Sequence, residues 1–378
     1  MNRIARTLLG RRDRGLPVYD LSAANPLGVL PSYPSEPLIE TARSYLAERC
    51  HEPDPQGSPD ARRALCDWYR RRYGLACSAE QLVITASTSE SYQLLIQTLC
   101  LPGSSILVPS PSYPLIEEFA IQRGVRPRGV PLRRHHGWRY SPHSYEGVLD
   151  RSVAAIVLVS PNNPTGTVIA PDELAELIRL LAVLPERPVL IIDEVFAESM
   201  FGDHRTCHHL AIESDYPTIL LNGLSKSFCA PDLKVGWMVG NDAAWERCGA
   251  ALVYANDLLL SCSGLNQALM TTMLTEGDGY HGLVAKALTA RLEATSKLMR
   301  SYSWLHPFSP QGGWMVFAEL LRDGIEEEDF FERAAFEGVA IHPGYFYGVA
   351  TPGMFASFSL LVEGEVLRKG LEVLDGIA

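Results

Sequence analysis

Five short apolar runs, separated by helical stretches or loops, constrain the fold of this chain more than any other feature. The runs lie at residues 105–109, 154–159, 188–193, 218–222 and 235–239. Helical patterns between them include residues 92–101, 113–123 and 171–184. Strands that alternate with helices form a mostly parallel sheet covered on both faces. Because ligands bind such sheets beyond the carboxyl ends of the strands, the residues that follow each run are candidates for a site.

The pattern changes near residue 285. A long helical segment at 282–302 is followed by a mixture of strand and helix signals, which predicts a smaller α+β unit. At 378 residues the chain also exceeds one typical domain. We therefore predict a large α/β domain over residues 45–285. Residues 286–378, together with the N-terminal segment 1–44, are expected to form the small domain.

Composition excludes several classes of partner. The net charge of −11 argues against nucleic acid, and we interpret the five arginines between residues 3 and 14 as a surface arm. No apolar run reaches the roughly 18 residues that a membrane helix needs, so we expect a soluble protein with no membrane partner. The eight cysteines lack a CxxC pair or metal-ligand spacing, which predicts reduced thiols, no metal site and a cytoplasmic location.

Lys226 is the candidate nucleophile. It follows an apolar run in the segment Gly223-Leu224-Ser225-Lys226. A buried lysine is costly as a cation, so the side chain either reaches water or loses proton affinity and acts as a free amine. Free amines form Schiff bases with carbonyl compounds, above all with pyridoxal phosphate (PLP). Taken alone, a lysine in this position is more often an ordinary surface lysine after a strand. The other candidate residues described below favour the nucleophile instead.

Two further polar side chains follow apolar runs. Asp193 ends one run, and a carboxylate there could hold a protonated pyridine nitrogen, which makes the ring an electron sink. Asn163, in Asn162-Asn163-Pro164-Thr165-Gly166, is held extended before proline and can direct its amide at the phenolic oxygen of the cofactor. The alternative for Asp193 is an aspartate that only marks the end of a strand. The alternative for Asn163 is an ordinary Asn-Pro turn.

Ser87, Thr88 and Ser89 lie between a strand and a helix. Free backbone N–H groups and the helix dipole favour a phosphate at such a position, although helix caps carry the same residue types. Tyr113 ends another strand and could stack on a flat cofactor, although a tyrosine on the rim is the commoner case.

In order and spacing, these segments resemble the class I/II aminotransferases of PLP fold type I over nearly the whole chain. The motifs that carry the resemblance are Asn163-Pro164-Thr165-Gly166, Asp193-Glu194, and Ser225-Lys226 with a basic residue eight positions later. The resemblance implies an aspartate aminotransferase-like fold with a mostly parallel, seven-stranded sheet. It implies that Lys226 forms the Schiff base and shuttles the proton, that Asp193 pairs with the pyridine nitrogen, and that Asn163 contacts the phenolic oxygen.

The resemblance also implies cofactor contacts for the remaining candidates, which are Ser87, Thr88, Ser89, Tyr113, Ser225, Lys234 and His51. Four positions depart from the family pattern. Lys234 replaces an arginine and loses its bidentate fork. Phe196 replaces a tyrosine, and Gly223 stands where a serine is frequent. His51 stands where the family has a tyrosine that reaches the phosphate from the partner subunit.

The largest departure concerns the substrate carboxylate. The arginine that clamps this group in the family corresponds to Ser357, and a neutral hydroxyl cannot replace the clamp. Three explanations stay open: another cation takes over, the substrate lacks a conventional α-carboxylate, or the alignment is shifted. Asn25, Tyr345 and His342 are further candidates for substrate contacts. The alternatives are an ordinary turn at Asn25, and loop side chains that only pack or cap at His342 and Tyr345.

We therefore predict a homodimeric, PLP-dependent aminotransferase that moves an amino group between an amino acid and a 2-oxo acid through Lys226. The alternative is a PLP-dependent lyase, decarboxylase, cyclase or oxidase acting on a specialised amino acid, which Ser357 and Phe196 motivate. A PLP-sensing regulatory module would need an attached DNA-binding segment, and the first fifty or so residues carry no recognisable helix-turn-helix.

Overall fold

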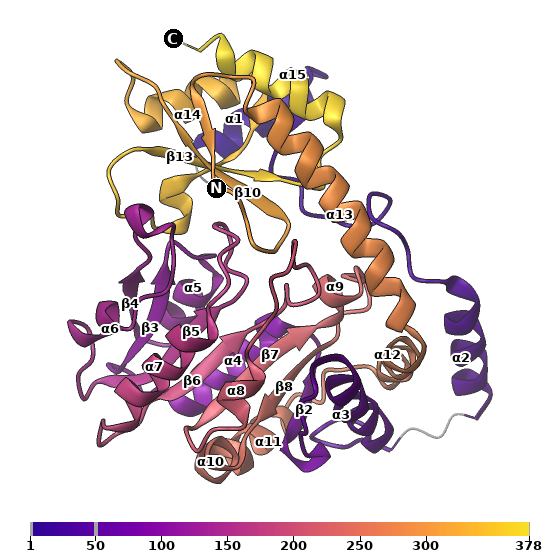
Figure 1. Ribbon diagram of the computed structural model, residues 1–378. Coiled ribbons are helices and arrows are strands. Elements are labelled where there is room, and N and C mark those ends of the chain that lie inside the picture. Colours follow the sequence, from indigo (N-terminus) through magenta and orange to yellow (C-terminus); the bar gives the residue numbers. More distant parts are fainter. Residues whose placement is uncertain (1–2, 49–51, 378) are drawn as a thin grey trace.

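A seven-stranded sheet forms the centre of the computed structural model, which describes residues 3–48 and 52–377 (Figure 1). The strand order is β2-β8-β7-β6-β5-β3-β4, and only β8 runs antiparallel to its neighbours. The strands are β2 (Leu82–Thr85), β3 (Ser105–Ser110), β4 (Arg126–Pro131), β5 (Val153–Val159), β6 (Val189–Asp193), β7 (Thr218–Gly223) and β8 (Gly236–Gly240). The predicted fold class, with its mostly parallel sheet, is confirmed.

The strands of this sheet are apolar on both faces, because helices cover each face. In β6, Val189 and Ile191 join one core, whereas Leu190 and Ile192 join the other. Successive side chains of a strand point to opposite faces, so a doubly covered strand is a continuous apolar run. Each such side chain contributes about 1.5–3 kcal/mol when it is fully buried.

The helices divide between these two faces. One core includes side chains of α4 (Thr88–Leu99), α5 (Leu115–Gln122) and α11 (Ala250–Asp257). The other includes side chains of α3 (Pro59–Tyr73) and α7 (Pro171–Ala182) and continues into the core of a second sheet. The short helices are η1 (Ala79–Gln81), η2 (Arg134–His136), α6 (His143–Glu146), α8 (His209–Ile212), α9 (Leu224–Ser227), α10 (Asp242–Ala244), the π-helical turn η3 (Trp245–Gly249) and η4 (Gly344–Tyr347).

The second sheet has four antiparallel strands in the order β12-β13-β10-β9. They are β9 (Leu305–Pro307), β10 (Met315–Leu320), β12 (His342–Pro343) and β13 (Met354–Ser359). Figure 1 shows α14 (Glu327–Glu337) and α15 (Gly364–Asp375) beside this sheet, and the long helix α13 (Asp278–Met299) running between the two sheets along one side. The domain boundary predicted at residue 285 falls within α13.

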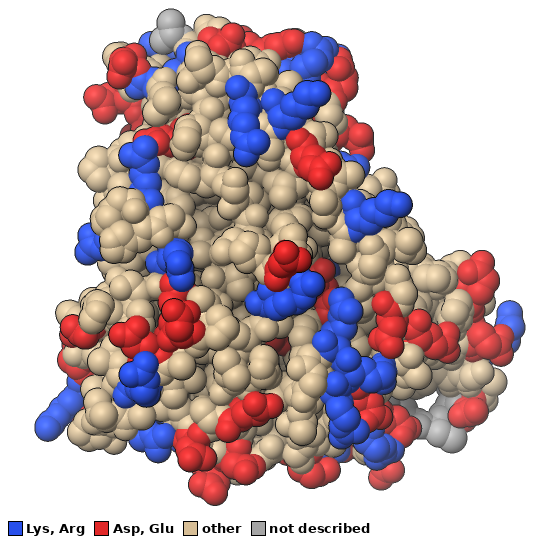
Figure 2. Space-filling model, viewed as in Figure 1, with Lys and Arg blue, Asp and Glu red and all other residues tan. Residues whose placement is uncertain are grey.

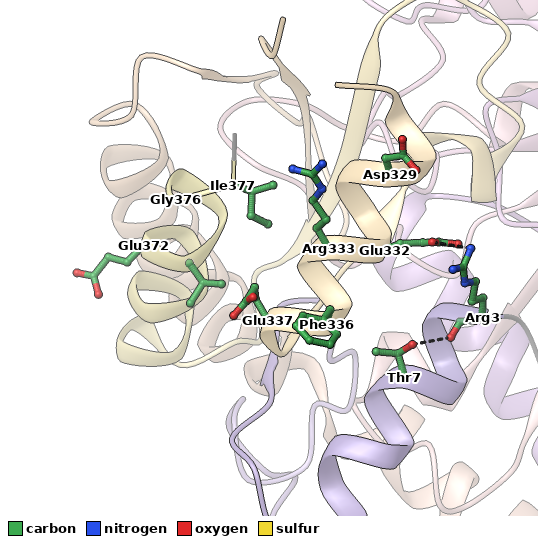
Figure 3. Close-up of a pocket in the computed structure, with 11 residues that line it drawn as sticks. Arg3, Thr7, Asp329, Glu332, Arg333, Phe336, Glu337, Glu372, Gly376 and Ile377 are labelled. Atoms are coloured by element: carbon green, nitrogen blue, oxygen red, sulfur yellow. Dashed lines mark hydrogen bonds and ion pairs between the residues drawn. The ribbon is translucent and has the colours of Figure 1, made fainter. Parts of the chain in front are cut away.

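The N-terminal segment interpreted as a surface arm is a helix, α1 (Arg3–Asp13), which packs against α14. Arg3 and Glu332 form an ion pair at 2.8 Å, drawn as a dashed line in Figure 3. Arg11 donates a hydrogen bond to the Phe336 carbonyl. The strand β1 (Tyr19–Asp20) then pairs with β11 (Val339–Ala340). These contacts attach the beginning of the chain to the four-stranded side of the molecule.

Two more helices, α2 (Ser35–Glu48) and α12 (Gly264–Glu276), pack against each other, and Thr41 Oγ1 lies 2.7 Å from Thr272 Oγ1. Within the described ranges, no helix combines the length and apolar character needed to cross a membrane. Figure 2 shows basic and acidic side chains intermixed over the visible face, with the longest row of basic side chains over α3, whose sequence contains five arginines.

Candidate active site

A cavity of about 400 Å³ lies at the carboxyl ends of the parallel strands, where the seven-stranded sheet meets the four-stranded sheet. The first sheet and its helices supply most of the polar lining. The second sheet supplies Met315 and His342, and Trp314 lies directly before its strand β10. Nine of the residues predicted to contact the cofactor line this cavity: Ser87, Thr88, Ser89, Tyr113, Asn163, Asp193, Ser225, Lys226 and Lys234. Side chains far apart in the sequence therefore meet at the edge that the strand pattern indicates.

Lys226 lies on α9, the single helical turn that begins where β7 ends. Its Nζ atom is 4.8 Å from the ring centroid of Trp314 and 5.9 Å from that of Phe196. The two rings pack edge to face, and Trp314 Nε1 donates to Ser199 Oγ at 2.9 Å, which fixes the indole. Burial lowers the pKa of Lys226. The wall therefore favours the neutral amine, which is the nucleophilic form.

Asp193 is the last residue of β6. Its Oδ2 atom accepts a hydrogen bond from Tyr92 Oη at 2.8 Å, and its Oδ1 atom accepts one from Val195 N at 3.1 Å. Burial raises the pKa of Asp193 to about 6, although both hydrogen bonds act in the opposite direction. The group is therefore ionised at neutral pH, so the cavity contains a buried anion.

Tyr92 was not predicted as a site residue. It lies on α4, four residues after Thr88, and both side chains line the cavity. Residues four apart share one face of a helix, so the sequence did hold a signal once Thr88 had been placed in the site. The contact with Asp193 spans 101 residues of chain, and nothing in the local pattern indicates it.

Glu194 points to the other side of the sheet from Asp193, as the alternation of a strand requires. Its carboxylate accepts a hydrogen bond from Tyr69 Oη at 2.6 Å and lies 2.9 Å from His208 Nδ1. Trp237 Nε1 donates to Tyr69 Oη at 3.0 Å. This buried network connects β6, β8 and α3 behind the cavity and holds the strand ends in register.

The start of α4 has the features of a phosphate site. Ser87 caps the helix, because its Oγ accepts from Glu90 N at 3.2 Å. Thr88 and Ser89 form the first turn, where backbone N–H groups lack partners within the helix. A Cβ atom on Gly236 would lie 2.5 Å from Thr88 N, so only glycine lets β8 approach this turn so closely.

Asn163 and Lys234 complete the polar lining. The Asn163 Oδ1 atom is buried and has no hydrogen-bond partner within residues 3–48 and 52–377. Lys234 is exposed at the cavity rim and has a left-handed backbone with φ of 51°. Tyr113 is also on the rim, with 44% of its side chain exposed. An orphaned amide oxygen indicates a polar ligand in the cavity.

The structure does not bring all the predicted substrate residues to the cavity. The Asn25 Oδ1 atom accepts from Leu27 N at 3.1 Å within an exposed turn, and the nearby residues Ser22 and Ala24 line the cavity instead. The ring of Tyr345 packs against Phe331 outside the cavity.

Ser357 is buried within β13 and does not itself line the cavity. It lies beside Tyr347, whose pKa burial raises to about 12 although Ser357 acts to lower it. His342 and Tyr347 do line the cavity. His51 falls outside the described residues.

Together, these groups fit a flat heteroaromatic aldehyde that carries a phosphate, as PLP does. The amine of Lys226 can bond to the aldehyde, the Asp193 carboxylate can pair with a ring nitrogen, and the start of α4 can hold the phosphate. The orphaned Asn163 amide would meet the remaining polar substituent. Fold and site therefore define a PLP enzyme with its cofactor at the carboxyl edge of the sheet.

Comparison with known proteins identifies the family. The chain belongs to the aminotransferase class I and II family, whose model matches residues 22–357. It is 27% identical over 373 residues to the arginine–pyruvate transaminase of Pseudomonas aeruginosa, covering 96% of this chain and 90% of the relative. It is 30% identical over 330 residues to an S-alkyl-thiohydroximate lyase of Arabidopsis thaliana, covering 84% and 70%.

The structure of an alanine aminotransferase from Pyrococcus furiosus superposes with a TM-score of 0.90 at 21% identity and covers 98% of this chain and 95% of that chain. These findings confirm the predicted family, the aspartate aminotransferase-like fold, the PLP cofactor and the activity. The chain is a PLP-dependent aminotransferase that transfers an amino group between an amino acid and a 2-oxo acid.

Proposed function

We propose that Lys226 is the residue that binds PLP covalently and moves the proton during amino transfer. The supporting observation is the position of its amine, at a strand end, against two aromatic rings and in the same cavity as the Asp193 carboxylate. When bound, PLP supplies an electron sink for the carbanion at the substrate α-carbon. Every other task in the reaction falls to side chains of this chain.

The roles of these side chains follow from their chemistry. Asp193, held by Tyr92, keeps a negative charge where a pyridine nitrogen needs one. Burial lowers the pKa of the Lys226 amine, so this amine would be suited to take the α-proton of a substrate and return it one atom away. Phe196 and Trp314 exclude water from this amine. The phosphate is held by Ser87, Thr88, Ser89, Ser225 and Lys234. The ring is contacted by Asn163 and Tyr113. Candidates for further cofactor or substrate contacts are His51, Asn25, Ser357 and Tyr345.

The test of this assignment is Lys226→Ala. We expect the purified variant to lose the absorbance that borohydride reduces, and to lose the covalent label on the peptide that contains residue 226. Lys297→Ala, which changes an exposed lysine on α13, is the matched control and should keep both. A reducible chromophore that survives in the first variant on another lysine would contradict the assignment.

A second candidate activity is elimination on a specialised amino acid. One relative at 30% identity is named as a lyase, and the phenyl ring of Phe196 cannot supply the hydroxyl that a tyrosine would. Spectroscopy of one half-reaction separates the two activities. A transaminase given only an amino donor accumulates the aminated cofactor, whereas a lyase returns to its starting spectrum.

We also propose a reducing cytoplasm, a homodimer with shared sites, and a division into a large domain (residues 45–285) and a small domain (1–44 and 286–378). The seven cysteines within the described residues are all free thiols, which supports the first point. The family resemblance, with His51 at a position that the partner subunit lends, supports the second. Full activity from a species that sediments only as a monomer would refute the dimer.

A further inference from the structure

The cavity wall formed by the four-stranded sheet carries polar groups that have no role in holding PLP. His342 and Ser357 are directly paired on β12 and β13, so their side chains lie on the same face of the sheet. His342 Nδ1 lies 3.2 Å from Tyr347 Oη. Both His342 and Tyr347 line the cavity, on the side that also carries Met315. This polar corner therefore faces the space that a substrate would enter.

A substrate carboxylate in this space needs a positive partner. Moving a carboxylate out of water is costly unless a cation or several donors meet it. The lining residues of the described chain include two side chains that are ordinarily cationic, Lys226 and Lys234, and both have proposed roles with the cofactor. Ser357 cannot carry a charge. His342 is the remaining lining side chain that can become a cation in the physiological pH range.

We propose that His342 is the specificity-determining residue for the substrate carboxylate, and that its imidazole takes up a proton from solvent when the substrate binds. This inference rests on the proposed function of the same cavity. Tyr347 fixes the ring through Nδ1, which leaves Nε2 without a protein partner in the described parts of the chain. The ring of Phe346 stacks on His342 at 4.8 Å between centroids and keeps the imidazole in one plane.

The charges around His342 set the direction of the effect. Burial lowers the pKa of His342, and the Asp20 carboxylate acts against that shift. Among the described residues, six other titratable groups face this space. They are Tyr347 on η4, Tyr113 in the loop between β3 and α5, Tyr92 on α4, Asp193 on β6, and the two lysines, Lys226 and Lys234. In the free enzyme the ring is therefore neutral at neutral pH. An arriving carboxylate stabilises the imidazolium, so carboxylate binding and proton uptake are coupled.

This coupling makes affinity depend on pH. Above the pKa of free His342, the dissociation constant of a carboxylate ligand should rise about tenfold per pH unit, because one proton must bind with it. A neutral ligand of the same shape should show no such rise. A site with a permanent guanidinium would show neither the slope nor the proton uptake, since arginine stays charged throughout this range.

The experiment uses the holoenzyme and two unreactive probes, 3-phenylpropanoate and its neutral amide. Calorimetric titration in phosphate and in Tris buffer, from about pH 6 to about pH 8.5, gives both the dissociation constant and the number of protons taken up. We expect about one proton for the carboxylate and none for the amide. The absorbance of the cofactor, recorded in parallel, identifies any proton that is taken up at the cofactor instead.

His342→Gln keeps a polar group beside Tyr347 but cannot become a cation. We expect it to lose the proton uptake and at least tenfold of the affinity for the carboxylate at about pH 6, with the amide unaffected. His306→Gln is the matched control, since His306 is an exposed histidine on β9 of the same sheet.

Equal affinity for the two probes in the wild-type enzyme would overturn the proposal, and so would an unchanged pH slope in His342→Gln. Failure of the proposed function is a separate outcome, because it would appear as the absence of any spectral change with amino donors.

Discussion

Tyr92→Phe removes the side-chain hydrogen bond that Asp193 accepts from Tyr92, without opening a large space. The phenol donates to Oδ2 at 2.8 Å, and hydrogen bonds to charged groups contribute about 1.5–3 kcal/mol. Each 1.36 kcal/mol corresponds to about one pKa unit. Loss of the phenol should therefore raise the pKa of Asp193 from about 6 by roughly one to two units.

The direction of this pKa shift determines the pH range in which PLP binding is weakened. With a higher pKa, Asp193 in the variant is largely protonated at about pH 7 and becomes ionised only as the pH rises further. A protonated carboxyl cannot hold a cationic pyridine nitrogen. We expect the affinity for PLP to fall about tenfold near pH 7 and to approach that of the wild type near pH 9.

The assay is the quenching of tryptophan fluorescence when PLP is added to cofactor-free enzyme between about pH 6.5 and about pH 9. Tyr254→Phe is the matched control, because 66% of the Tyr254 side chain is exposed. Thermal unfolding of both variants measures any general loss of stability. An equal weakening of PLP binding at every pH would show that Tyr92 acts through packing alone, and an unchanged affinity near pH 7 would refute the reasoning.

Two other substitutions test the surroundings of the site. Glu198→Gln removes a carboxylate that is 2% exposed and accepts three hydrogen bonds from Arg72. We expect a loss of about 2–4 kcal/mol in unfolding free energy by urea titration, because Arg72 stays partly buried without its counter-charge. A loss below about 0.5 kcal/mol would show that the pair contributes little. Trp314→Ala admits water to Lys226, and this hydration outweighs the lost cation–π attraction of about 0.5–2 kcal/mol. The pKa of Lys226 should rise, so PLP uptake by the cofactor-free variant should be slower near neutral pH and recover in alkaline buffer. Stopped-flow absorbance measures this uptake. Uptake without such a pH dependence would count against the role of the indole.

Some elements of the fold escaped the sequence analysis for local reasons. The strand β4, Arg126–Pro131, pairs with β3 at the edge of the sheet, where one side of the strand has no neighbour and polar residues are tolerated. The helix α12 was missed because threonines, which are poor helix formers, interrupt its pattern. In the folded chain, the Thr271 and Thr275 hydroxyls bond to backbone carbonyls four residues earlier.

The central strands and three of the side chains at the site could be predicted from sequence alone. Lys226, Asp193 and Asn163 lie at or just after the ends of apolar runs, and parallel strands bring their carboxyl ends to one edge whatever the rest of the chain does. Strands that are buried on both faces consist of consecutive apolar residues, so a local sequence pattern is enough to predict them.

Only the tertiary structure decided which side chains surround these groups. Tyr92 contacts Asp193 across 101 residues, and the indole of Trp314, directly before β10, lies over Lys226. Tyr347 rather than Tyr345 lines the cavity. These contacts depend on how the two sheets and their helices pack. The hydrophobic periodicity of the sequence does not predict that packing. The proton affinities of the lysine and the aspartate depend on the same contacts, because burial and hydrogen bonds from distant residues set them.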